Sequence, residues 1–93
     1  MDKEKAMAVL AEQLRLYRTK SYAELKDLLG QVDAYEVATP DGLPYQIEIQ
    51  VFWDGIPDSN IRVIGTIDDG RWRAFSPLSD DFIMTPEGAF LGE

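Results

Sequence analysis

Residues 45–53 read YQIEIQVFW, an unbroken alternation of apolar and polar side chains up to the final aromatic pair. A period of two places alternate side chains on opposite faces of a β-strand. The apolar face carries Tyr45, Ile47, Ile49, Val51 and Trp53. This stretch therefore predicts a half-buried strand of an antiparallel sheet, with one face against a core and the other facing away.

A hairpin is predicted on the N-terminal side of this strand. Residues 39–42 read TPDG, which suits a type I turn followed by a glycine in the left-handed region. Such a loop places the apolar side chains of both strands on one face. The resulting pairs are Thr39 with Leu43, Val37 with Tyr45 and Tyr35 with Ile47.

A second hairpin is predicted on the C-terminal side, after the polar loop of residues 54–60. The third strand runs from Ile61 to Asp68, and residues 69–70, Asp-Gly, favour a two-residue type I′ turn because both of its central positions need positive φ. A fourth strand then extends over residues 71–75. Its predicted register places Ile67 opposite Trp72, Thr66 opposite Arg73, Gly65 opposite Ala74 and Ile64 opposite Phe75. Gly65 then either leaves room beside Trp72 or marks a β-bulge.

Two helices are predicted ahead of the sheet. Apolar residues spaced three or four apart indicate an amphipathic helix from about Lys3 to Arg18. Ser21 and Glu24 match a capping box, and Gly30 is a typical stop signal, so a second, shorter helix follows. One kinked helix is an alternative interpretation of the two segments.

The expected fold class is therefore α+β, in one domain spanning residues 1–93. The helices pack on one face of a twisted antiparallel meander of about four strands, and a C-terminal hairpin joins residues 82–84 to 89–91. A chain of 93 residues suffices for one hydrophobic core but not for two.

The composition argues against an enzyme and against a metal or cofactor. The chain has no cysteine and no histidine, so disulfides, thiolate zinc sites, cysteine nucleophiles and histidine general bases are excluded. Residues 54–60 lack the ligand spacing of a calcium loop and read as a polar turn. The aspartate pairs at 68–69 and 80–81 are expected to serve turns and cap backbone amides rather than catalyse a reaction.

The net charge of −8 is unevenly distributed along the chain. Residues 1–26 hold six basic and four acidic side chains (+2), whereas residues 27–93 hold three basic and thirteen acidic ones (−10). Such a β half repels nucleic acid and attracts a basic protein partner, although the charge can also serve solubility alone. No stretch is apolar enough to span a membrane, and the charged start is unlike a signal peptide, so a cytoplasmic location is expected.

The sheet face turned away from the helices is the candidate site. In the predicted register Phe52, Ile64 and Phe75 stand there among polar residues that include Glu48 and Arg73. Grouped apolar side chains on an uncovered face favour an interface, formed with a second copy or with another protein. The alternative is that sheet curvature or the C-terminal hairpin buries them in a second small core.

A small-molecule pocket between helix and sheet is a second hypothesis for function. Most of the aromatic side chains lie on predicted inner faces, where they either fill the core or line a cavity with tyrosine hydroxyls at its mouth. These residues are Tyr17, Tyr22, Tyr35, Tyr45, Trp53 and Trp72.

Residues 61–75, IRVIGTIDDGRWRAF, continued by residues 77–84, PLSDDFIM, resemble a small family of bacterial proteins of unknown function. The resemblance extends over most of the chain. It implies no activity, ligand or residue role, so the expectations above rest on the residues themselves.

Overall fold

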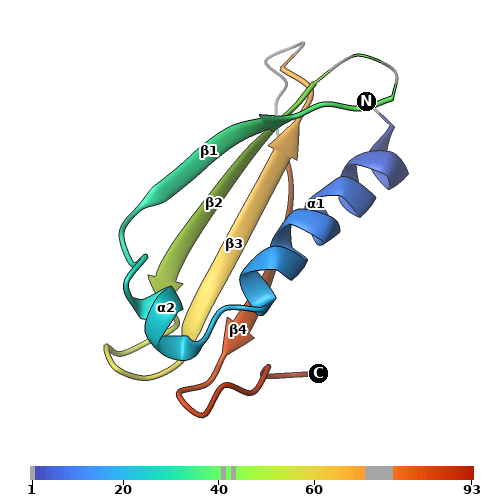
Figure 1. The fold of residues 1–93 in the computed structure, drawn as a ribbon. Helices are drawn as coiled ribbons and strands as arrows, with labels where there is room; N and C mark the ends of the chain where they lie inside the picture. Colours follow the sequence, from blue (N-terminus) through green and yellow to red (C-terminus); the bar gives the residue numbers. More distant parts are fainter. Residues whose placement is uncertain (1, 41, 43, 71–76) are drawn as a thin grey trace.

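The computed structural model describes all residues except 1, 41, 43 and 71–76, and it has the α+β architecture expected from the sequence (Figure 1). A long helix and a short helix accompany a four-stranded antiparallel sheet whose strands follow one another in the order β1-β2-β3-β4. The elements are α1 (Lys3–Arg18), α2 (Tyr22–Lys26), β1 (Val32–Val37), β2 (Tyr45–Trp53), β3 (Ile61–Asp68) and β4 (Leu78–Met84).

Local capping determines where the helices begin. The Asp2 side chain accepts a hydrogen bond from the Lys5 amide, 3.1 Å away, and so caps α1. The predicted capping box is confirmed in α2, where the Ser21 hydroxyl accepts from the Glu24 amide and the Glu24 carboxylate accepts from the Ser21 amide. The helices are separate, and α2 ends at Lys26, before the predicted stop at Gly30.

The first predicted hairpin has the expected register. Val37 lies opposite Tyr45, and Tyr35 lies opposite Ile47. Gly42 adopts a φ of 88°, and its amide donates to the Thr39 carbonyl oxygen over 2.9 Å, as the turn chemistry predicts. The predicted pair of Thr39 with Leu43 involves residue 43, which lies outside the described residues.

The second predicted hairpin is wrong in its pairing. Ile67 lies opposite Leu78 and Ile64 opposite Asp81, while β2 occupies the other side of β3. The partner of β3 is therefore β4, which begins at Leu78, four positions before the predicted start at residue 82. The predicted strand over residues 71–75 lies outside the described residues.

Burial explains why β3 pairs with this later segment. The observed register sets Phe82 opposite Val63 and Met84 opposite Ile61, and all four side chains are buried on the helix side of the sheet. The Asp69-Gly70 signal is local and holds only in part: Gly70 has a φ of 71°, but Asp69 lacks the positive φ that the predicted type I′ turn requires. The signal also does not determine how far the connection extends.

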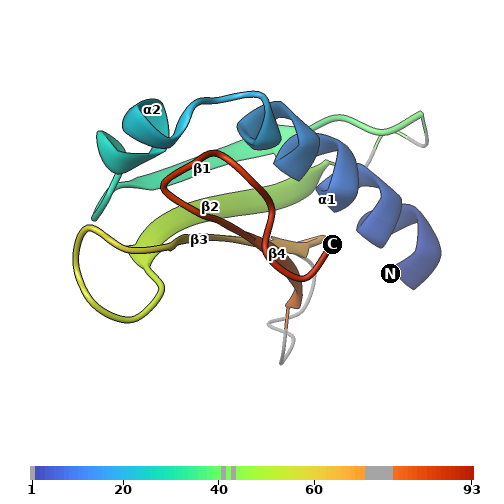
Figure 2. The ribbon, with the colours of Figure 1, turned by 90° about the horizontal axis from the view of Figure 1, so that it is seen from below.

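The core lies between α1 and the sheet face that both helices cover (Figure 2). Gly65 sits at its centre, opposite Ile49 on one side and Asp80 on the other, in a register without a bulge. A Cβ atom at Gly65 would lie 2.8 Å from Cδ1 of Leu10 and 3.2 Å from Cδ2 of Leu14. The glycine therefore lets α1 pack closely on the sheet. The bulge predicted as one role for it is absent from this register, and the other predicted role, room for Trp72, involves a residue outside the described part of the chain.

After β4 the chain returns along the edge of that strand and packs against α1. A single bridge joins Met84 to Phe90, and the Leu91 amide donates to the Ile83 carbonyl oxygen over 2.9 Å. The Arg18 guanidinium lies 4.8 Å from the ring centroids of both Phe82 and Phe90. These contacts attach the C-terminal segment to the end of α1.

Candidate interaction surface

We use the term outer face for the sheet surface opposite the helices. The strand registers place alternate residues on it: Val32, Ala34 and Glu36 of β1; Gln46, Glu48, Gln50 and Phe52 of β2; Arg62, Ile64, Thr66 and Asp68 of β3; Ser79, Asp81 and Ile83 of β4. Both α1 and α2 lie on the opposite side of the sheet (Figure 2). Within the described part of the chain, no helix covers the outer face.

Apolar side chains gather toward the end of the outer face where β2 ends. Phe52 is 43% exposed, and Ile64 and Ile83 are half-buried. Arg62 pairs with Phe52 on one side and with Ile83 on the other, while Ile64 follows two residues along β3. The three apolar residues therefore surround Arg62, and we call Phe52, Ile64 and Ile83 the apolar cluster.

The sequence prediction places part of this surface. Phe52, Ile64 and Glu48 share the outer face, whereas Phe75 and Arg73 lie outside the described residues. The prediction missed Ile83, since its face depends on which strand β4 pairs with. Phe82, Ile83 and Met84 are all apolar, so no alternation of polar and apolar residues could have assigned Ile83 to a face.

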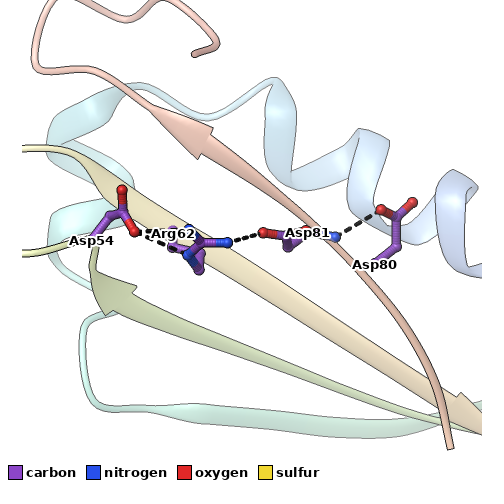
Figure 3. A network of polar contacts seen from close by, with 4 residues as sticks. All are labelled: Asp54, Arg62, Asp80 and Asp81. Carbon is purple, nitrogen blue, oxygen red and sulfur yellow. Dashed lines mark hydrogen bonds and ion pairs between the residues drawn. The ribbon is translucent and has the colours of Figure 1, made fainter. Parts of the chain in front are cut away.

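Arg62 is the centre of the polar contacts on this face (Figure 3). Its Nη2 and Nε atoms donate to Oδ1 of Asp54 over 2.9 and 3.1 Å, and its Nη1 donates to Oδ2 of Asp81. The Asp81 amide in turn donates to Oδ1 of Asp80 over 2.8 Å. The hydrogen bonds to Asp54 and the nearby carboxylates raise the pKa of Arg62.

The described residues of the outer face carry a net negative charge. Its described residues include four carboxylates, those of Glu36, Glu48, Asp68 and Asp81, and one cation, Arg62, which already has two carboxylate partners. The carboxylates nearest the apolar cluster, those of Asp54 and Asp81, are paired with Arg62, and those of Glu36, Glu48 and Asp68 lie farther along the strands. A face that combines an apolar cluster with a net negative charge is complementary to a surface that combines apolar and basic side chains.

The aspartate pairs have structural roles in the described residues. Asp80 accepts a hydrogen bond from the Asp81 amide, as predicted for a residue that caps a backbone amide, and Asp68 accepts one from the Gly70 amide over 2.7 Å. Asp80 and Asp81 lie within β4, whereas the sequence predicted a strand that begins only at residue 82. Among the described residues no group of three or more acidic side chains is arranged to hold a metal ion.

Tyrosine hydroxyls join the helical layer to the sheet and to the loop beyond it. The Tyr17 hydroxyl donates to the Asp33 carboxylate, and the Tyr35 hydroxyl donates to Oε1 of Gln13 over 2.8 Å. The Tyr22 hydroxyl donates to the Ser59 carbonyl oxygen over 2.6 Å.

Two cavities, of about 130 and 330 Å³, lie between α1 and the β1 side of the sheet. Only the larger reaches the lower end of the range usual for small-molecule sites, about 300–1,000 Å³.

We expect these contacts to make stability fall at alkaline pH. Burial and the neighbouring Asp33 raise the pKa of Tyr17, and burial raises that of Tyr35. A phenol that holds its proton more tightly when folded contributes stability that is complete below its unfolded pKa of about 10 and is lost as pH rises above it. Urea unfolding between pH 8 and pH 11 should therefore show a shallower alkaline decline for Tyr17→Phe than for the unchanged protein. Equal slopes would contradict this origin of the decline.

No protein-family model matches the chain. No curated protein and no solved structure matches it either. No helix among the described residues is both long and apolar enough to cross a membrane.

Proposed function

We propose that this protein is a non-enzymatic protein-interaction module whose outer face binds a partner surface carrying apolar and basic side chains. The observation that carries the proposal is the apolar cluster beside carboxylates on a sheet face that α1 and α2 leave uncovered. Single exposed apolar residues are common on protein surfaces, but a group of them on one uncovered face is typical of an interface.

The charge of the molecule favours a different protein over a second copy. Two copies that meet through their outer faces bring together molecules of net charge −8 and set carboxylates against carboxylates. The same negative charges attract a basic partner and increase its association rate, and they repel acidic proteins. The apolar cluster then supplies contacts that exclude water and slow dissociation.

Two outer-face variants test the proposal. Partners captured by the unchanged protein are identified, purified and titrated against Phe52→Glu and Ile64→Glu. We expect each variant to weaken binding by about tenfold or more, because a buried carboxylate replaces an apolar contact at the centre of the interface. Leu16→Glu is the matched control: Leu16 is 56% exposed and lies on α1, on the far side of the sheet, so this variant should bind normally.

Further readouts separate a partner at this face from other outcomes. Circular dichroism establishes that each variant is folded. Raising the salt concentration should lower the association rate far more than it raises the dissociation rate. A captured protein that binds Phe52→Glu and Ile64→Glu as tightly as it binds the unchanged chain contradicts the proposal. A dimer in light scattering that Phe52→Glu dissociates would assign the face to a second copy.

A further inference from the structure

The two edges of the sheet are protected differently. At the β4 edge the chain returns to pair Phe90 with Met84, and the Leu91 amide donates to the Ile83 carbonyl oxygen. At the β1 edge no described residue pairs with Val32–Val37 from outside the sheet. This strand contains no proline, glycine or lysine, the residues that commonly block an edge.

Two separate cavities flank the open edge, one near each end of β1, and we call the two together the furrow. α1 packs on β3 and β4, and β1 lies at the far side of the sheet from β4 (Figure 1). The cavity of about 130 Å³ lies at the start of β1, beside Tyr17 and Val32. The cavity of about 330 Å³ lies beyond its end, beside Val9 and Ala38. Both open between the helix and the edge strand, on the side where a fifth strand would direct alternate side chains.

The charged side chains of β1 leave the edge accessible. On the helix side, the Asp33 carboxylate accepts a hydrogen bond from the Tyr17 hydroxyl. On the outer face, the Glu36 carboxylate accepts one from the Gln46 side chain of β2 over 2.9 Å. Both carboxylates are therefore held by groups of the same molecule. Their charge still determines which extended segment the edge attracts, because opposite charges across strands stabilise a pair and like charges destabilise it.

We propose that the open edge of β1 binds an extended peptide as a fifth antiparallel or parallel strand, with apolar side chains entering the furrow and basic side chains beside the carboxylates. Backbone hydrogen bonds supply affinity in this mode, and pockets for alternate side chains supply specificity. The strand has six residues, so a fully paired peptide spans about 20 Å. This surface is distinct from the outer face.

Charge favours a basic peptide over a second copy at this edge too. Pairing of two β1 strands would bring Asp33 and Glu36 of both copies to one seam and join two molecules of net charge −8. A peptide with lysine or arginine at these positions neutralises the seam.

The test begins with random peptides of about 12 residues displayed on phage and selected on the full chain. We expect selected sequences to alternate apolar with polar or basic residues. A selected peptide is then synthesised with N-methyl groups at every second residue, in two complementary sets. In an added strand, alternate amides face β1, so one set should weaken binding by about tenfold or more while the other changes it by less than about twofold.

Protein variants and amide exchange locate the site. Ala8 is exposed on α1 and lines the larger cavity, whereas Ala11 is exposed on the same helix and does not line it. Ala8→Arg adds bulk and positive charge at the furrow and should weaken peptide binding by about tenfold. Ala11→Arg should weaken peptide binding by less than about twofold. Bound peptide should slow hydrogen exchange of β1 amides. Phe52→Glu should leave peptide binding intact, which separates this site from the outer face.

Several results would overturn the proposal. These are a library that yields no binder, equal effects of the two N-methyl sets, and amide protection confined to the outer face. If protection of the β1 amides from hydrogen exchange increases with protein concentration in the absence of peptide, the occupant of the edge is instead a second copy.

Discussion

Gly65→Val is expected to lower the free energy of unfolding by about 3 kcal/mol, since overfilling a packed core forces side chains out of their rotamers. Even a single added Cβ atom would lie 2.8 Å from Cδ1 of Leu10 and 3.1 Å from Cδ1 of Ile49. Leu10 is fully buried between α1 and the sheet, so it has little free space into which to move. Urea unfolding followed by circular dichroism measures the change.

Two further variants make the test specific. Thr66→Val changes the next residue of β3, which faces away from the helices, and should alter stability by less than about 0.5 kcal/mol. Leu10→Ala alone should cost about 3 kcal/mol because it opens a cavity. In the double variant the valine occupies part of that cavity, so the combined cost should be smaller than the sum by about 1 kcal/mol or more. Additive costs would show that α1 does not pack directly on Gly65.

Arg18→Ala is expected to lower the free energy of unfolding by about 2 kcal/mol, because the Arg18 side chain joins α1 both to β4 and to the C-terminal segment that follows β4. Its guanidinium lies over the rings of Phe82 and Phe90, which themselves meet edge to face at 5.6 Å. It also donates two hydrogen bonds, of 2.7 and 2.8 Å, to the Glu93 carboxylate. The ion pair is partly solvated, so most of the effect should come from the aromatic contacts.

Arg15→Ala is the matched control for this effect. Arg15 lies on the same helix and forms an ion pair with Glu12, and the two side chains are 69% and 53% exposed. An exposed pair of this kind contributes little, so the variant should change stability by less than about 0.5 kcal/mol. Hydrogen exchange should also accelerate in residues 85–93 of Arg18→Ala and not of Arg15→Ala. Identical behaviour of the two variants would contradict the proposed attachment.

The proposed outer-face site was accessible to sequence reasoning only in part. The period of two in β2 and β3 assigns Phe52, Glu48 and Ile64 to one face without any knowledge of the rest of the fold. Ile83 joins them because β4 pairs with β3 in one particular register. That register depends on burying Phe82 and Met84, which is a contact between distant segments and leaves no local signal.

The sequence by itself determined the features that depend on neighbouring residues. The capping box at Ser21, the first hairpin register and the alternation of β2 all follow from turn chemistry, side-chain capping and a short period. Each involves residues close in the chain, so a short window of sequence contains the whole physical cause.

Only the tertiary structure decided which segment pairs with β3, why residue 65 is a glycine, and which sheet edge stays open. The pairing brings residues 78–84 to β3 because that register buries apolar side chains that another would expose. The position of α1 over β3 and β4 then requires a residue without a side chain beneath Leu10 and leaves β1 uncovered at its edge. These outcomes depend on the packing of segments far apart in sequence, where free energy is shared among many contacts.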